Sequence, residues 1–120
     1  MPYKDPLYPY VNRWFAASEG AIADKFIHTI SEKNQDRLIE EKGACIMYTH
    51  FAFGFFDGKK IHPDFVRLMT RLAKEPGWFV PVANLLDYIQ EQRGDYTLSN
   101  RERYQLQWSW LKHKFKVGQS

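Results

Sequence analysis

The chain has 120 residues, of which 44% are hydrophobic and 26% are charged, so it suits one folded domain and is not a disordered segment. Its formal net charge of +3 comes from scattered Lys and Arg side chains, without the dense basic patch typical of specific nucleic-acid binding. A single cysteine excludes an internal disulfide framework, and the absence of a signal-peptide pattern or a long apolar run predicts a cytoplasmic protein without a membrane span.

The first part of the chain predicts an extended arm followed by two helices. Prolines among tyrosines predict the arm over residues 1–13, because proline fixes φ and lacks a hydrogen-bond donor. Residues 19–30 carry apolar side chains at helical spacing, with Ser18 as the expected N-cap. Ser31 is expected to cap a short second helix that ends at Gly43.

Two strands are expected in the middle of the chain. The continuous apolar run 44–49 predicts a strand that is covered on both faces, as in a parallel sheet. A helix is expected to begin at Pro63. Residues 78–82 predict the second strand, which we expect at an edge of the sheet because Pro81 interrupts its hydrogen bonding.

Two further helices complete the predicted order of elements. The first is expected to end at Gly94, and the second opens with the capping-box pair Ser99 and Glu102. The last helix carries four large apolar residues on one side: Tyr104, Trp108, Leu111 and Phe115. Strands separated by helices predict parallel pairing through right-handed crossovers, although two strands are few for an open sheet. The chain therefore reads as one partial α/β domain, with residues 14–94 as its main part and 95–120 as a C-terminal helix and tail.

Three segments carry a family resemblance. In chain order they read CIMYTHFAFGF, KEPGWFVPVANLLDYI and LSNRERYQLQWSWLKHK. Together they resemble the C-terminal region of bacterial polysaccharide-deacetylase-like proteins, of the NodB-homology, carbohydrate esterase group, over most of the chain from about Trp14. The resemblance implies the C-terminal part of a distorted (β/α) barrel. It also implies a protein that removes acetyl groups from N-acetylated sugars with the help of a divalent metal.

The same resemblance implies roles for particular residues. The family holds its metal with an aspartate and an H-x-x-x-H pair, and this sequence contains no such pair. A later leucine-x-histidine motif supplies a general acid, and Tyr48-Thr49-His50 stands where that motif is expected, with tyrosine in place of leucine. We therefore expect His50 to be catalytic in a complete protein, Tyr48, Phe51 and Phe53 to contact the acetylated polysaccharide, and this chain to supply no metal ligand.

Each of these roles has a structural alternative. His50 can instead end a strand by hydrogen bonding to the backbone, and at least two of the four phenylalanines within residues 51–56 are expected in the core. Cys45 is expected to be a small core residue. The predicted function is thus the C-terminal portion of a deacetylase-like hydrolase, inactive as an isolated chain. The alternative is a non-catalytic module that binds a glycan or a protein and forms a homo-oligomer.

Overall fold

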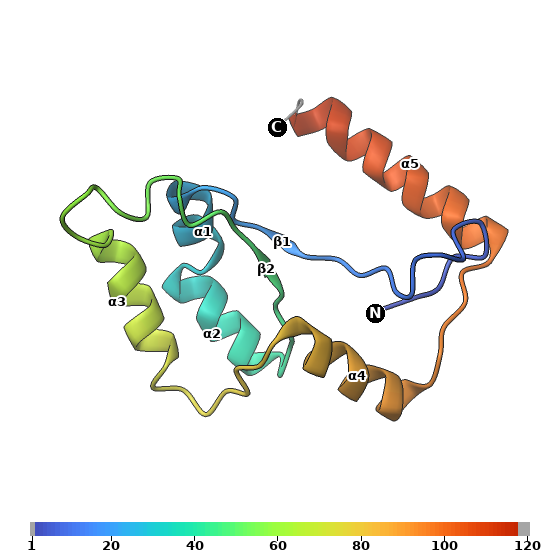
Figure 1. The fold of residues 1–120 in the computed structure, drawn as a ribbon, viewed down its shortest axis with the longest axis horizontal. Helices are drawn as coiled ribbons and strands as arrows, with labels where there is room; N and C mark the ends of the chain where they lie inside the picture. Colours follow the sequence, from blue (N-terminus) through green and yellow to red (C-terminus); the bar gives the residue numbers. More distant parts are fainter. Residues whose placement is uncertain (1, 118–120) are drawn as a thin grey trace. The chain divides into compact units, whose positions relative to one another are not determined.

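The computed structural model describes residues 2–117, and within them the chain is a mixed α/β protein with five helices and two short strands (Figure 1). The chain forms two compact units, one made of Ala16–Val82 and the other of the segments on either side of it. None of the helices in the described part of the chain is long and apolar enough to cross a membrane. The sequence-based division at residues 13 and 94 stays a prediction.

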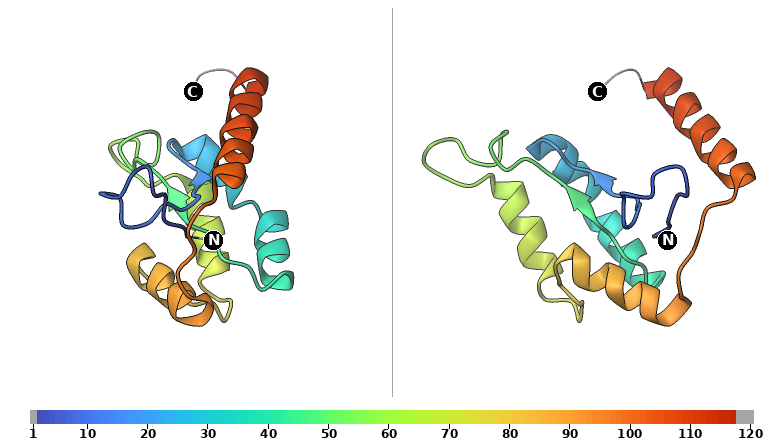
Figure 2. Two further views of the ribbon diagram at one scale, coloured as in Figure 1. Left: turned by 90° about the vertical axis from the view of Figure 1, so that its right-hand side faces the viewer. Right: turned by 45° about the vertical axis from the view of Figure 1, so that its right-hand side comes forward.

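The unit Ala16–Val82 contains a two-stranded parallel sheet. Its strands are β1 (Ser18–Glu19) and β2 (Met47–Tyr48), and the crossover between them contains α1 (Ala23–Thr29) and α2 (Glu32–Glu40) (Figures 1 and 2). Parallel pairing through a helical crossover is therefore confirmed.

The prediction that residues 78–82 form the second strand of the sheet was wrong. Residues 78–81 form no regular structure, and α4 (Val82–Arg93) begins directly after Pro81. Proline removes a backbone donor, so this short segment has little capacity to join a ladder. The strand expected over 44–49 is reduced to β2, and Cys45 is exposed rather than buried.

The start of the first helix also differs from expectation. Ser18 lies in β1 and does not cap a helix; α1 begins at Ala23, with Ile22 as its N-cap. The reason lies at Gly20, where an added Cβ would be 2.7 Å from the Met47 side chain. Because the chain passes so close to β2 here, it stays extended for longer than the apolar spacing indicates.

The core of this unit lies where α1 meets α3 (Pro63–Leu72). The buried cluster consists of Ala23, Phe26, Ile30, Phe55 and Leu68. The predicted start of α3 is confirmed, with proline in the first turn and the His62 Nδ1 accepting a hydrogen bond from the Asp64 backbone N–H at 3.3 Å.

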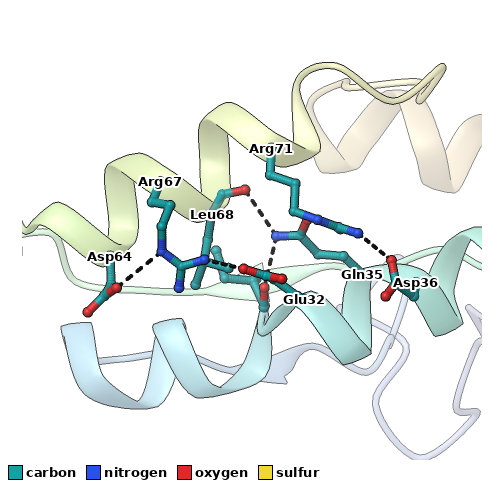
Figure 3. A network of polar contacts seen from close by, with 8 residues as sticks. Glu32, Gln35, Asp36, Asp64, Arg67, Leu68 and Arg71 are labelled. Carbon is teal, nitrogen blue, oxygen red and sulfur yellow. Dashed lines mark hydrogen bonds and ion pairs between the residues drawn. The ribbon is translucent and has the colours of Figure 1, made fainter.

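A buried amide joins α2 to α3 (Figure 3). Gln35 is 2% exposed, and its Nε2 donates to the carbonyls of Ile30 (2.9 Å) and Leu68 (3.0 Å), while its Oε1 accepts from Arg71 at 2.9 Å. Arg71 also pairs with Asp36 on α2. A buried polar group with all of these partners costs little and fixes the relative placement of the two helices.

The second unit combines the N-terminal arm with α4 and α5 (Asn100–Val117). The arm is not simply extended: Tyr3 and Trp14 exchange backbone hydrogen bonds, so it folds back on itself. Lys4 then donates its backbone N–H to the Tyr96 carbonyl at 2.7 Å. The segment before α5 is thereby tied to the arm.

The predicted ends of α4 and α5 are confirmed. Gly94 follows α4 with φ of +74°, a conformation that favours glycine. Before α5, the Ser99 N–H donates to Glu102 Oε2 at 3.0 Å and the Glu102 N–H donates to Ser99 Oγ at 3.3 Å. Hydrogen bonds from Ser99, and then from Tyr96, lower the pKa of Glu102 to about 2.

Candidate functional site

His50 lies just after β2, at a point where the loop is tied to the start of α1. Its backbone N–H donates to the Ala21 carbonyl at 3.1 Å, and its own carbonyl accepts from the Phe53 N–H at 3.1 Å. The Ala23 N–H in turn donates to the Phe53 carbonyl at 3.0 Å. These three bonds hold residues 50–53 in one conformation. The prediction that His50 follows a strand end is confirmed.

The side chain of His50 is exposed and lies between two aromatic rings. Its Nε2 is 2.7 Å from the Tyr48 hydroxyl oxygen, and the two rings meet edge to face with centroids 4.9 Å apart. The His50 ring also contacts the ring of Phe53, with the two centroids 6.0 Å apart and an interplanar angle of 89°. The rings of Tyr48 and Phe53 are each more than half exposed. The structure therefore brings together three of the four predicted site residues.

Phe51, the fourth predicted site residue, contacts a different group of side chains. Its ring meets those of Phe55 and Phe65 at centroid distances of 5.1 and 6.1 Å, although it remains 61% exposed. Phe55 is buried, and Phe53 and Phe56 are exposed, so only one of the four phenylalanines in 51–56 is a core residue. The expectation of at least two was wrong, because aromatic content alone does not say which loop positions face inward.

Thr49 is a residue of this site that the sequence did not single out. Its Oγ1 is buried and, among the described residues, makes no hydrogen bond. Buried hydroxyls normally have a partner, so Thr49 is an exception within the segment that carries Tyr48 and His50. The position inside the Tyr48-Thr49-His50 motif was the only sequence signal for it.

Gly54 does not leave open space beside the site, as a substrate-facing glycine would. Its φ is +80°, and an added Cβ would lie 3.3 Å from the Ala23 Cβ. Gly58, in the turn held by the Asp57 carboxylate, also has positive φ (+92°) but nothing within 4 Å of an added Cβ. Glycine at 54 is thus required by both backbone conformation and close packing on α1.

We expect Gly54→Ala to lower the free energy of unfolding by about 1–2 kcal/mol through left-handed backbone strain, plus a further contribution from the contact with Ala23. Gly58→Ala is the matched control, since it introduces the backbone strain without that contact. Chemical denaturation followed by circular dichroism measures both. Equal losses for the two variants would show that the loop does not pack on α1 as described.

The described residues contain no group of three His, Cys, Asp or Glu side chains that could hold a metal ion. The contacts of His50 are with the Tyr48 hydroxyl, the rings of Tyr48 and Phe53, and backbone groups. Within residues 2–117, the side chains therefore do not supply a three-ligand set for the metal that the family resemblance implies. What the site offers is an imidazole, a phenol hydroxyl and an apolar ring on an exposed surface, a combination suited to binding a molecule with both polar and apolar faces.

No family model matches the chain, and the comparisons with curated proteins and with solved structures likewise found no match.

Proposed function

We propose that the chain is the C-terminal portion of a polysaccharide-deacetylase-like hydrolase and that Tyr48, His50 and Phe53 form its contact surface for an N-acetylated sugar. The observation that carries the proposal is the pairing of His50 with Tyr48 between exposed aromatic rings. A sugar presents hydroxyl groups around an apolar ring face. Aromatic side chains with polar tips match that pattern, because they offer apolar area and hydrogen bonds together.

The fold supports this proposal through its incompleteness. Two parallel strands with a helical crossover are the repeating unit of a (β/α) barrel, and the proposed complete protein supplies the other strands. In that protein, His50 would act as general acid toward the leaving amine or stabilise the oxyanion, since imidazole exchanges protons near neutral pH. Its backbone hydrogen bond to Ala21 would fix the main chain at this position, and the Tyr48 hydroxyl would orient the ring.

We expect the chain to bind a chito-oligosaccharide and Phe53→Ala to weaken that binding by about two- to tenfold, the range of a single aromatic contact. Tyr48→Phe removes only the hydroxyl that meets His50, and we expect a smaller loss from it. Titration monitored by NMR shifts of backbone amides measures both effects and shows whether residues 48–53 respond.

Phe56→Ala is the matched control, because Phe56 lies in the same loop and is exposed to the same degree as Phe53, at 58% against 57%. Its affinity should equal that of the unmodified chain. Equal losses from Phe53→Ala and Phe56→Ala, or shifts confined to residues outside 48–53, would count against the proposed surface.

A second candidate function is self-association through the loop that follows β2. The observation that favours it is the exposure of four large apolar side chains in this loop, since contiguous apolar surface marks interaction sites. These are Phe51, Phe53, Phe56 and Ile61. Light scattering without sugar separates the two functions: a dimer that both Phe53→Ala and Phe56→Ala weaken would favour self-association.

A further inference from the structure

Helix α5 carries an apolar stripe on one side. Its members are spaced by four, three and four residues: Tyr104, Trp108, Leu111 and Phe115. This is the spacing of the a and d positions that face a partner in coiled coils and other helix pairs. All four side chains are exposed, and Phe115 is 83% exposed.

The anchor of α5 lies before the stripe. Arg103, in the first turn, is buried and pairs with Asp5 of the arm, and Leu98 just before the helix is also buried. The capping pair Ser99 and Glu102 completes this anchored end. The stripe begins at Tyr104, directly after Arg103, so a partner can cover it without disturbing the contacts that hold the helix.

The charged residues that flank the stripe are all of one sign. In the positions next to the seam α5 has Gln105 and Gln107 in the first half, and Lys112 and Lys114 in the second. From residue 103 to the end of the helix the sequence contains no Asp or Glu. Charges in these flanking positions set the choice of partner in paired helices. A second copy of α5 would bring more lysines and no counter-charge.

Two apolar residues outside the stripe argue against a membrane surface as the occupant. Leu106 and Trp110 lie on the opposite side of the helix, and both are exposed. A helix that lies in a membrane interface keeps its apolar groups on one face and its charges on the other. In α5 a charged group instead lies next to one of these apolar rings, since the Lys114 amino group is 5.8 Å from the centre of the Trp110 ring.

We propose that the stripe of α5 is the docking surface for an amphipathic helix of another protein, one with an aliphatic seam flanked by Glu or Asp. Trp108 and Phe115 are the anchors, because large aromatic side chains in buried pockets dominate such interfaces. Lys112 and Lys114 select the partner by charge. None of the residues of this surface belongs to the proposed sugar contact around His50.

The test uses a fluorescently labelled synthetic peptide of a few heptads with leucine at the seam and glutamate in the flanking positions. We expect it to bind the full chain, and Trp108→Ser and Phe115→Ser each to weaken binding at least about tenfold in fluorescence anisotropy. Leu106→Ser is the matched control on the opposite side of α5 and should bind as the unmodified chain does. Circular dichroism checks that α5 stays helical in every variant.

A charge swap makes the test specific. The double variant Lys112→Glu, Lys114→Glu should no longer bind the glutamate-flanked peptide. It should instead bind a peptide with lysine in the flanking positions. The proposal is overturned if neither peptide binds, or if both bind the unmodified chain equally. Trp108-dependent binding to vesicles of anionic phospholipid, Trp108-dependent binding to RNA, or Trp108-dependent dimer formation, each without peptide binding, would also overturn it and identify the other occupant.

Discussion

Leu68→Ala is expected to lower the free energy of unfolding of the chain by about 2–5 kcal/mol, the usual cost of removing a large aliphatic side chain from a packed core. Leu68 is 2% exposed and belongs to the cluster where α1 and α3 meet. Its backbone carbonyl accepts the bond from Gln35, and that bond is unchanged by the substitution. The loss therefore reports side-chain packing alone. Urea denaturation followed by circular dichroism measures it.

Val66→Ala is the control on the same helix, because Val66 is 45% exposed and outside the core cluster. Its effect should stay within about 0.5 kcal/mol, as for most surface substitutions. Similar losses for the two variants would contradict the placement of α3, since they would mean that its buried and exposed faces are not distinguished.

The helices were the most predictable part of this chain, because their signals are local. Proline at position 63, glycine at 94 and the Ser99–Glu102 box each act within one turn of the helix end that they mark. All three mark helix ends in the structure. Each signal needs only neighbours along the chain, so the sequence contains all the information.

The strands were less predictable, because their pairing depends on residues far apart in sequence. The run 44–49 and the run 78–82 have similar apolar content, but only the first forms part of a ladder. Its partner is β1, and the close approach of Gly20 to β2 that accompanies this pairing is not indicated by any periodicity in the sequence. The proline at 81 was a signal against the second strand and carried more weight than its apolar neighbours.

The site was predictable in its position and not in its contacts. The Tyr48-Thr49-His50 motif located His50 after a strand, and the structure adds the bond between His50 and Tyr48. Side chains two residues apart share one face of an extended chain, and here those of Tyr48 and His50 lean together until the hydroxyl oxygen is 2.7 Å from Nε2. The ring contacts of Phe51 with Phe55 and Phe65 could not be read from a run of similar phenylalanines.

The ion pair between Asp5 and Arg103 could not be predicted from local sequence, because 98 positions separate its two residues. Both side chains are at most 10% exposed, and the guanidinium Nε donates to both carboxylate oxygens at 3.0 Å. Removing the charge of Asp5 leaves the buried guanidinium of Arg103 with its hydrogen bond to Asn100 but without a counter-charge, which is destabilising. We therefore expect Asp5→Asn to lower the melting temperature by several degrees at neutral pH, and the loss to fall on the unit that contains the arm and α5.

The dependence of this loss on pH distinguishes the ion pair from simple packing. Hydrogen bonds from Arg103 hold the pKa of Asp5 below its ordinary value of 3.8, so the folded state binds this proton less readily than the unfolded state. The stabilisation is complete above pH 3.8 and is lost as the pH falls through the lower, folded value. Glu102 also titrates in acid, with a pKa of about 2. It is present in both the unmodified chain and Asp5→Asn, so its effect cancels in the difference between their melting temperatures. The gap in melting temperature between the unmodified chain and Asp5→Asn should therefore narrow below pH 3.8. A gap that stays constant down to pH 2 would mean that the carboxylate charge is not what Arg103 recognises.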